Sequence, residues 1–111
     1  MKLTIAFGLS LFALPSVLAA GESCYYWDGA KYGNVYGTCG NPNTCIQNMG
    51  YWVADRCPGG SNNRCCIRRS CTTTTGLGGL CTTVDRCIGS RGPGHNQAGR
   101  CPGPSNVQCC Y

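Results

Sequence analysis

The sequence predicts a small, disulfide-rich, mainly β protein made of two tandem six-cysteine modules, each a short antiparallel sheet. Twelve of the 111 residues are cysteine, and all twelve follow residue 20. They form two sets of six with the same order, each set ending in a cysteine doublet. Few aliphatic residues accompany them, so a large hydrophobic core is not available. We therefore expect cysteine pairing to hold the fold.

The first twenty residues are typical of a secretory signal peptide. Lys2 precedes a mostly apolar run that ends in Ala19 and Ala20, and polar residues follow from Gly21 onward. The run is short for a membrane-spanning helix, and no later segment is apolar enough to span. We expect a secreted, extracellular protein without a transmembrane segment that begins near Gly21; a retained N-terminal anchor is the alternative.

An internal repeat divides the remaining chain into a first module at 21–66, a linker at 67–70 and a second module at 71–111. Five residues separate the second and third cysteines in both modules, and seven separate the fourth cysteine from the doublet. The segments RCPGGSNNRCC at 56–66 and RCPGPSNVQCC at 100–110 agree at eight of eleven positions. This self-similarity indicates a duplication. The short linker predicts that the modules sit close together.

Turn-forming residues dominate the local patterns, so only short elements are expected. Strands are predicted at 32–39, around 51–54 and at the two doublets. The Pro-Gly-x-Ser-Asn segment before each doublet predicts a tight turn. A single helical turn is compatible with 43–49 or 82–88.

The cysteine order, its spacing and the glycines Gly37 and Gly79, each two residues before the second cysteine of its set, resemble the β-defensin (trans-defensin) arrangement. Sequence alone allows fifteen pairings per module. The resemblance implies one of them: Cys24 with Cys65, Cys39 with Cys57, Cys45 with Cys66, Cys71 with Cys109, Cys81 with Cys101 and Cys87 with Cys110. The second copy is also similar to small cysteine-rich modules of fungal secreted proteins, some joined to enzymes that attack bacterial cell walls. That similarity implies a fungal source.

Charge and aromatic residues provide the candidate binding groups. Without Lys2, eight basic and four acidic residues give a net charge of 8 − 4 = +4. Most of the excess lies after residue 66, where the candidate residues for an anionic surface are Arg68, Arg69, Arg86, Arg91 and Arg100. Ordinary solubility charge is the alternative interpretation. The basic residues form no helix and no RNA-binding pattern, so we expect no nucleic-acid partner.

Seven of the eight Tyr and Trp residues after residue 20 lie in the first module. Their rings can stack on sugars or lie at a lipid interface. The alternative is that they form the core, which we expect for about half of them because the aliphatic residues are so few. Tyr25, Trp27 and Trp52 are the candidate binding aromatics. Adjacent rings in a strand point to opposite faces, so Tyr25, Tyr26 and Trp27 cannot all bind together.

Catalytic and metal-binding patterns are absent from the sequence. The one histidine, His95, lies in a glycine-rich loop, and the four acidic residues occupy unrelated positions in the two repeats. Neither set matches an acid–base pair. The CxxC spacing of zinc sites is missing, and disulfides account for every cysteine. We expect no enzyme activity, no cofactor and no bound metal.

These observations lead to a hypothesis of a secreted antimicrobial, defensin-like protein that acts on microbial envelopes. A non-catalytic module that binds cell-wall glycan, either peptidoglycan or chitin, is the first alternative, and a host-directed effector or inhibitor is the second. Envelope attraction by charge fades with ionic strength, whereas ring stacking persists. The sequence leaves the oligomeric state open.

Overall fold

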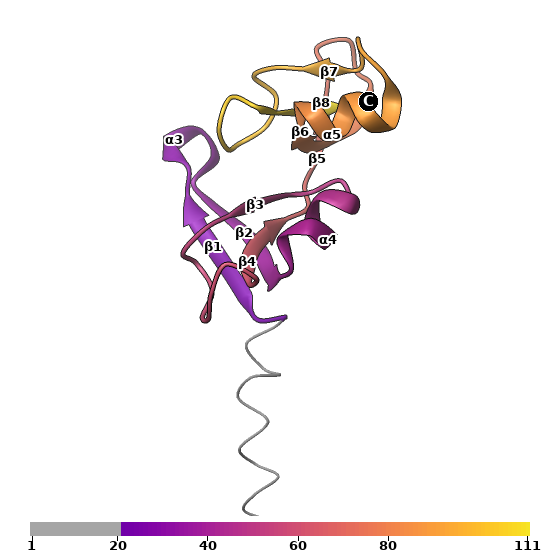
Figure 1. Ribbon diagram of the computed structural model, residues 1–111. Helices are drawn as coiled ribbons and strands as arrows, with labels where there is room; N and C mark the ends of the chain where they lie inside the picture. Colours follow the sequence, from indigo (N-terminus) through magenta and orange to yellow (C-terminus); the bar gives the residue numbers. More distant parts are fainter. Residues whose placement is uncertain (1–20) are drawn as a thin grey trace, which may run out of the picture.

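Two four-stranded antiparallel sheets make up the described part of the chain, residues 21–111 of a computed structural model (Figure 1). The expected signal peptide, residues 1–20, lies outside the described residues. Among residues 21–111, no helix is both long and apolar enough to cross a membrane. The predicted class, a disulfide-rich and mainly β fold, is confirmed.

The first sheet has the strand order β1-β2-β4-β3 and is interrupted by two short helices. Its elements are β1 (Ser23–Trp27), α3 (Gly29–Tyr32), β2 (Asn34–Gly40), α4 (Pro42–Gln47), β3 (Tyr51–Val53) and β4 (Arg64–Ile67). Helix α4 begins at a proline, and the side chain of Asn41 before it accepts hydrogen bonds from the backbone N–H groups of Asn43 and Thr44. This cap satisfies two N–H groups that a helix end leaves unpaired.

The second sheet repeats this plan with the order β5-β6-β8-β7. Its elements are β5 (Ser70–Thr72), β6 (Gly78–Thr83), α5 (Val84–Arg91), β7 (Asn96–Gln97) and β8 (Val107–Cys110). In both sheets the fourth strand lies between the second and the third, and a helix follows the second strand. The two halves of the chain therefore share one topology.

The predicted short elements agree with the structure in part. The strands expected at 51–54 and at the doublets correspond to β3, β4 and β8, and the helical turns correspond to α4 and α5. The strand expected at 32–39 begins only at Asn34, because Tyr32 belongs to α3. Gly29 and Gly33 bound this single turn with φ angles of 81° and 63°, which glycine adopts without steric cost.

Six disulfides link the cysteines, three within each half of the chain, and none of them crosses residues 67–70. They are the same six pairs that the resemblance to β-defensins implies: Cys24–Cys65, Cys39–Cys57, Cys45–Cys66, Cys71–Cys109, Cys81–Cys101 and Cys87–Cys110. Successive side chains of a strand point to opposite faces. In β4, Cys65 therefore bonds to β1 on one face while Cys66 bonds to α4 on the other.

Close contact between the second and fourth strands explains the glycine before the second cysteine of each module. A Cβ atom on Gly37 would lie 2.3 Å from the carbonyl oxygen of Cys66, and one on Gly79 would lie 2.3 Å from that of Cys110. Neighbouring backbone atoms cannot yield to such overlap without moving a strand. Each glycine is thus required by the approach of a backbone rather than by its own φ angle.

The two sheets pack directly against each other and share one core. The cluster of buried residues draws on both halves of the chain, including Tyr51 and Ile67 from the first and Val107 and Cys109 from the second. A Cβ on Gly103 would lie 3.0 Å from the ring of Tyr51, which is only 1% exposed. The backbone of Gly103 therefore lies close against this ring, and the burial of the ring supplies hydrophobic stabilisation.

Polar groups between the halves are also paired. The hydroxyl of Thr82 donates to the carbonyl of Gly50 at 2.8 Å, and the carboxylate of Asp28 accepts from the N–H of Gly103 at 3.0 Å. Close to this junction, the hydroxyls of Tyr26 and Tyr51 hydrogen-bond at 2.8 Å. These contacts fix how the two sheets are oriented, because a misaligned pair would leave a polar group unsatisfied.

We expect Gly37→Ala and Gly79→Ala to lower the free energy of unfolding, each by about 1–3 kcal/mol, because the added methyl overlaps a backbone carbonyl. Denaturant unfolding of the disulfide-intact protein measures the effect. Gly40→Ala and Gly78→Ala are matched controls, since a Cβ at either position meets nothing within 4 Å. Equal losses in variants and controls would contradict the overlap.

Alkaline pH should destabilise the fold through the tyrosine pair. Burial raises the pKa of the Tyr51 hydroxyl, and the bond to Tyr26 raises it further; burial also raises the pKa of Tyr26. An unfolded tyrosine ionises near pH 10, so above that pH the folded state binds more protons than the unfolded state. Below about pH 10 these two tyrosines are protonated in both states and do not change the free energy of unfolding. Above that pH the free energy of unfolding falls as the pH rises.

Denaturant titrations between about pH 8 and 11 would measure this loss, with mass spectrometry to verify that the six disulfides stay intact. Tyr51→Phe removes the more strongly shifted hydroxyl and should flatten the dependence. A wild-type free energy of unfolding that stays constant across this range would contradict the assignment.

Candidate binding face

Three aromatic side chains project from one face of the β1–β2 hairpin. Along β1 the odd-numbered residues are exposed and the even-numbered ones are buried, so Tyr25 and Trp27 point outward while Tyr26 points into the core. Tyr36 of β2 lies directly opposite Tyr25, with the ring centroids 5.6 Å apart. Tyr25, Trp27 and Tyr36 are 55%, 66% and 67% exposed. We call these three side chains the aromatic face.

Trp52 lies on the same side of the sheet but apart from the aromatic face. It pairs with Cys66 of β4, which in turn pairs with Thr38 of β2, and paired residues share a side. Two strands therefore separate Trp52 from β1. The guanidinium of Arg64 lies 4.0 Å from the Trp52 ring centroid, and the tryptophan is 37% exposed. One flank of this ring is already occupied by a cation.

The remaining aromatics of the first module have structural roles or are partly covered. Tyr26 and Tyr51 are buried and bond to each other. Tyr32 packs against the core, and the cationic groups of Lys31 and Arg69 lie 5.2 and 5.5 Å from its ring centroid. The six aromatics that lie in strands thus divide between core and surface by strand alternation, and Tyr32 belongs to α3.

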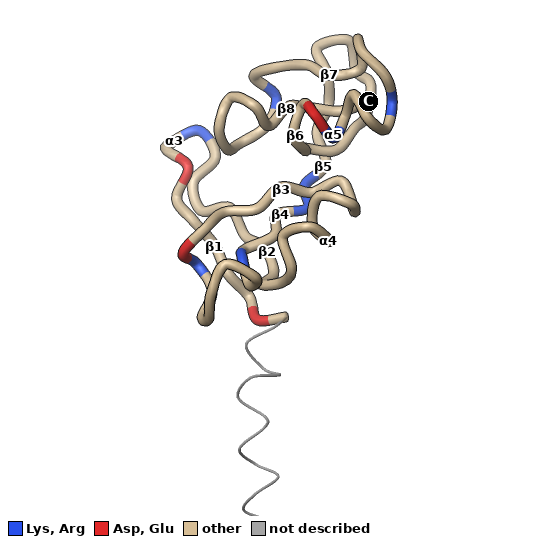
Figure 2. The backbone as a smooth tube through the Cα atoms, in the orientation of Figure 1, with Lys and Arg blue, Asp and Glu red and all other residues tan. Residues whose placement is uncertain are grey.

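The five candidate arginines do not form one patch; Figure 2 shows basic residues spread along the chain. Arg86 donates to the carbonyls of Ile46 and Gln47 at the end of α4, at 3.1 and 3.0 Å. Arg100 donates to the carbonyl of Thr72 at 2.7 Å. These two side chains tie segments of the protein together, so their guanidinium groups are held in place by internal hydrogen bonds.

The other three arginines differ in their surroundings. Arg69 lies beside Tyr32, and Arg91 is exposed in the last turn of α5. Arg68 lines a shallow depression of about 340 Å³ together with Tyr36 and Thr38. Of the five, only Arg68 is thereby placed next to the aromatic face.

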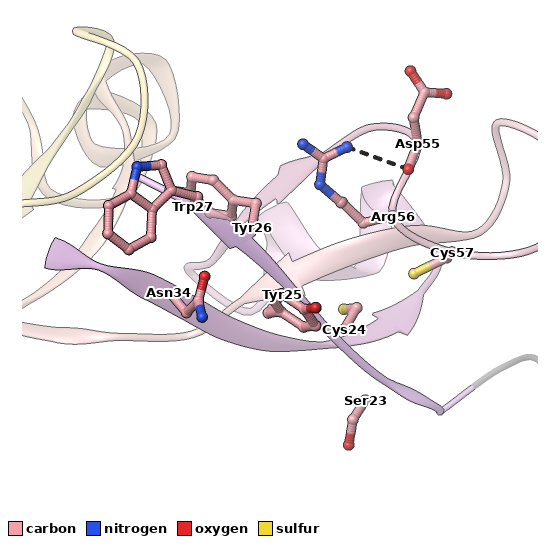
Figure 3. A pocket seen from close by; sticks show the side chains of 9 residues that line it. All are labelled: Ser23, Cys24, Tyr25, Tyr26, Trp27, Asn34, Asp55, Arg56 and Cys57. Atoms are coloured by element: carbon pink, nitrogen blue, oxygen red, sulfur yellow. Dashed lines mark hydrogen bonds between the residues drawn. The ribbon is translucent and has the colours of Figure 1, made fainter. Parts of the chain in front are cut away.

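A second hollow runs along the outer edge of β1 and has a volume of about 580 Å³. All five residues of β1 line it, together with Asn34 of β2 and the residues Asp55, Arg56 and Cys57 (Figure 3). Tyr25 and Trp27 therefore border both the aromatic face and this edge groove.

The sulfur atoms form two close groups whose geometry alone resembles a metal site. Cys24, Cys39 and Cys57 lie within 4.8 Å of one another, as do their counterparts Cys71, Cys81 and Cys101. All six are bonded in disulfides, and residues 21–111 contain no free cysteine. A disulfide sulfur lacks the thiolate charge that metal ligation needs. The proximity reflects two adjacent disulfides in each sheet.

Tyr36 is the one member of the aromatic face that is absent from the sequence-based candidates. It lies inside a predicted strand, but only the register of the β1–β2 hairpin places it opposite Tyr25. Its alternation with buried Val35 is the signal that identifies it as outward-facing.

No protein-family model, curated protein or solved structure matches this chain.

The bonds of Arg86 predict a stability effect that a nearby arginine on the same helix does not share. We expect Arg86→Ala to lower the free energy of unfolding by about 1–2 kcal/mol, because two backbone carbonyls of the other half lose their charged donor. Arg91→Ala is the matched control on α5 and should change stability by less than about 0.5 kcal/mol. Denaturant unfolding measures both variants, and equal effects would contradict the bridging role.

Proposed function

We propose that this protein is a secreted, non-catalytic binding protein that recognises β-linked cell-wall glycan through the aromatic face. The observation that carries the proposal is that Tyr25, Trp27 and Tyr36 are each more than half exposed in a protein that has few aliphatic residues after residue 20. Such a protein gains stability by burying its rings, so three rings left together on one surface favour a binding role.

The chemistry of the face suits a sugar. Each ring offers a flat apolar surface and a polar edge, which matches the apolar C–H face and hydroxyl rim of a pyranose. Along one face of a strand, side chains recur at about 6.7 Å, so Tyr25 and Trp27 form a row rather than a single contact. Disulfides and strand pairing fix the backbone beneath them, which limits the entropy lost on binding.

The position of the basic residues supports a glycan over a purely charge-driven envelope interaction. Arg86 and Arg100 are bonded to backbone carbonyls, and Arg64 lies over Trp52. Arg68, beside Tyr36, adds a donor at the rim of the face, where it can hydrogen-bond a glycan hydroxyl or carboxylate.

Antimicrobial action on an anionic envelope is the second candidate. The net charge of +4 that remains without Lys2 and the exposed Arg68 and Arg91 favour it. The two functions respond differently to salt, since screening at 1 M reduces the Debye length to about 3 Å but leaves stacking intact.

Sedimentation with insoluble peptidoglycan and with chitin tests the proposal and distinguishes the two glycan sources. We expect the oxidised protein to bind at least one of them at both low salt and about 1 M salt. Trp27→Ala and Tyr36→Ala should each weaken binding about tenfold, equivalent to about 1.4 kcal/mol.

Leu77→Ala is the matched control, because Leu77 is an exposed apolar residue of the second module, far along the chain from the aromatic face. Its glycan affinity should equal that of the wild type. Failure to bind either polymer would overturn the proposal, and binding that disappears at high salt would favour the envelope interaction instead.

A further inference from the structure

Arg68 lies beside the aromatic face, and within residues 21–111 its guanidinium group makes no hydrogen bond or ion pair. It is exposed and lines the shallow depression of about 340 Å³ together with Tyr36, Thr38 and Cys66. The hydroxyls of Tyr36 and Thr38 also have no hydrogen-bond partner in this part of the chain. The depression therefore presents polar groups that a ligand can bind, next to an exposed ring.

The strand register places Arg68 in line with two rings of the aromatic face. Thr38 of β2 pairs with Cys66 of β4, and continuing this antiparallel register by two residues places Arg68 opposite Tyr36. Tyr36 is itself paired with Tyr25 of β1, with the ring centroids 5.6 Å apart. Tyr25, Tyr36 and Arg68 thus form a row across three neighbouring strands, which lie about 4.8 Å apart. A sugar chain that stacks on the two rings can reach the guanidinium group with its next unit.

The neighbouring cations of the first half are in contact with the protein itself. Arg56 and Arg64 each donate to a backbone carbonyl. Arg69, the next residue in the sequence, lies beside the ring of Tyr32. Arg68 is the exception among them, because all five of its N–H donors are available to a ligand.

No acidic residue among residues 21–111 lines the depression. Asp85 belongs to α5, Asp55 lines the edge groove, and Asp28 bonds to the backbone of the second half. Glu22 directly precedes β1, and alternation along the chain directs its side chain away from the side of the aromatic face. The positive charge beside the rings is therefore not offset locally, which favours an anionic ligand.

We propose that Arg68 and its depression form a subsite for the carboxylate of an acidic sugar, so that the protein prefers a carboxylate-bearing β-linked glycan to a neutral one. This inference rests on the proposed glycan function and names the class of glycan. A guanidinium group donates two parallel N–H bonds to one carboxylate, which gives both charge and geometric selectivity. The hydroxyls of Tyr36 and Thr38 supply hydrogen-bonding groups for the sugar that carries the carboxylate.

Two kinds of glycan share this chemistry, and each has a neutral counterpart. Peptidoglycan carries carboxylates on the lactyl and peptide substituents of an N-acetylated β-linked backbone, which chitin has without those substituents. Polymannuronate carries a carboxylate on each β-linked ring, whereas β-mannan has none. Comparison within each pair isolates the contribution of the carboxylate, and comparison between the pairs identifies its source.

Isothermal titration calorimetry of the oxidised protein with soluble oligosaccharides from these four glycans tests the inference. At low salt we expect at least one acidic oligosaccharide to bind about fivefold more tightly than its neutral counterpart, since the ion pair is partly exposed to solvent. At about 1 M salt the ratio should fall toward one, because the charge is screened while ring stacking persists. Equal affinities within both pairs at low salt would overturn the subsite and leave the glycan function in place. Binding to none of the four would overturn the glycan function itself.

Variants of Arg68 test whether this side chain is responsible. Arg68→Gln should weaken binding of the acidic oligosaccharide about fivefold and leave binding of the neutral one unchanged. Arg68→Glu should weaken the acidic ligand further through repulsion. Arg91→Gln is the matched control, because Arg91 is also exposed and its loss changes the net charge equally. Equal losses in Arg68→Gln and Arg91→Gln would indicate a general attraction to polyanions and overturn the subsite.

Vesicles that contain phosphatidylglycerol distinguish a sugar carboxylate from a lipid phosphate, which a guanidinium group also binds. We expect Arg68→Gln to change binding of the acidic oligosaccharide more than binding of these vesicles. A protein that binds the vesicles through Arg68 but shows no preference for the acidic oligosaccharides would overturn the inference and favour the envelope interaction.

Discussion

The adjacent cysteines at the end of each module are the constraint on which the fold depends. Because neighbouring side chains of a strand point to opposite faces, Cys65 bonds to β1 while Cys66 bonds to α4. The central strand β4 is therefore fixed on both sides of the sheet. The same arrangement recurs in β8, where Cys109 bonds to β5 and Cys110 to α5. Strand pairing and helix position both follow from this anchor.

Covalent anchoring of the sheets changes what the aromatic residues need to do. A sheet of this size usually requires its large side chains for burial, yet here the core consists largely of cysteine, with Tyr26, Tyr51, Val35 and Ile67. Disulfides lower the conformational entropy of the unfolded chain. They therefore reduce the hydrophobic area that must be buried for the protein to fold. Tyr25, Trp27 and Tyr36 can then stay exposed without loss of the fold, which is why the surface carries an aromatic row.

The fold class was predictable from the sequence because cysteine order and density report it directly. The division of the aromatics was predictable only in principle: alternation separates Tyr25 from Tyr26, but the hairpin register that adds Tyr36 requires coordinates. The arginines show why residue type was insufficient. Arg86 and Arg68 look alike in the sequence, yet one bonds carbonyls 40 and 39 residues away, and the other borders an exposed ring. Long-range contacts of this kind leave no local pattern.

All six disulfides stay within their own half of the chain, which has a consequence for biosynthesis. Twelve cysteines in one pool could combine in roughly ten thousand ways, whereas two separate sets of six have fifteen each. Because each set of six pairs only within itself, neither half depends on a cysteine of the other for its covalent bonds, and the halves meet only through packing and hydrogen bonds such as those of Tyr51 and Gly50.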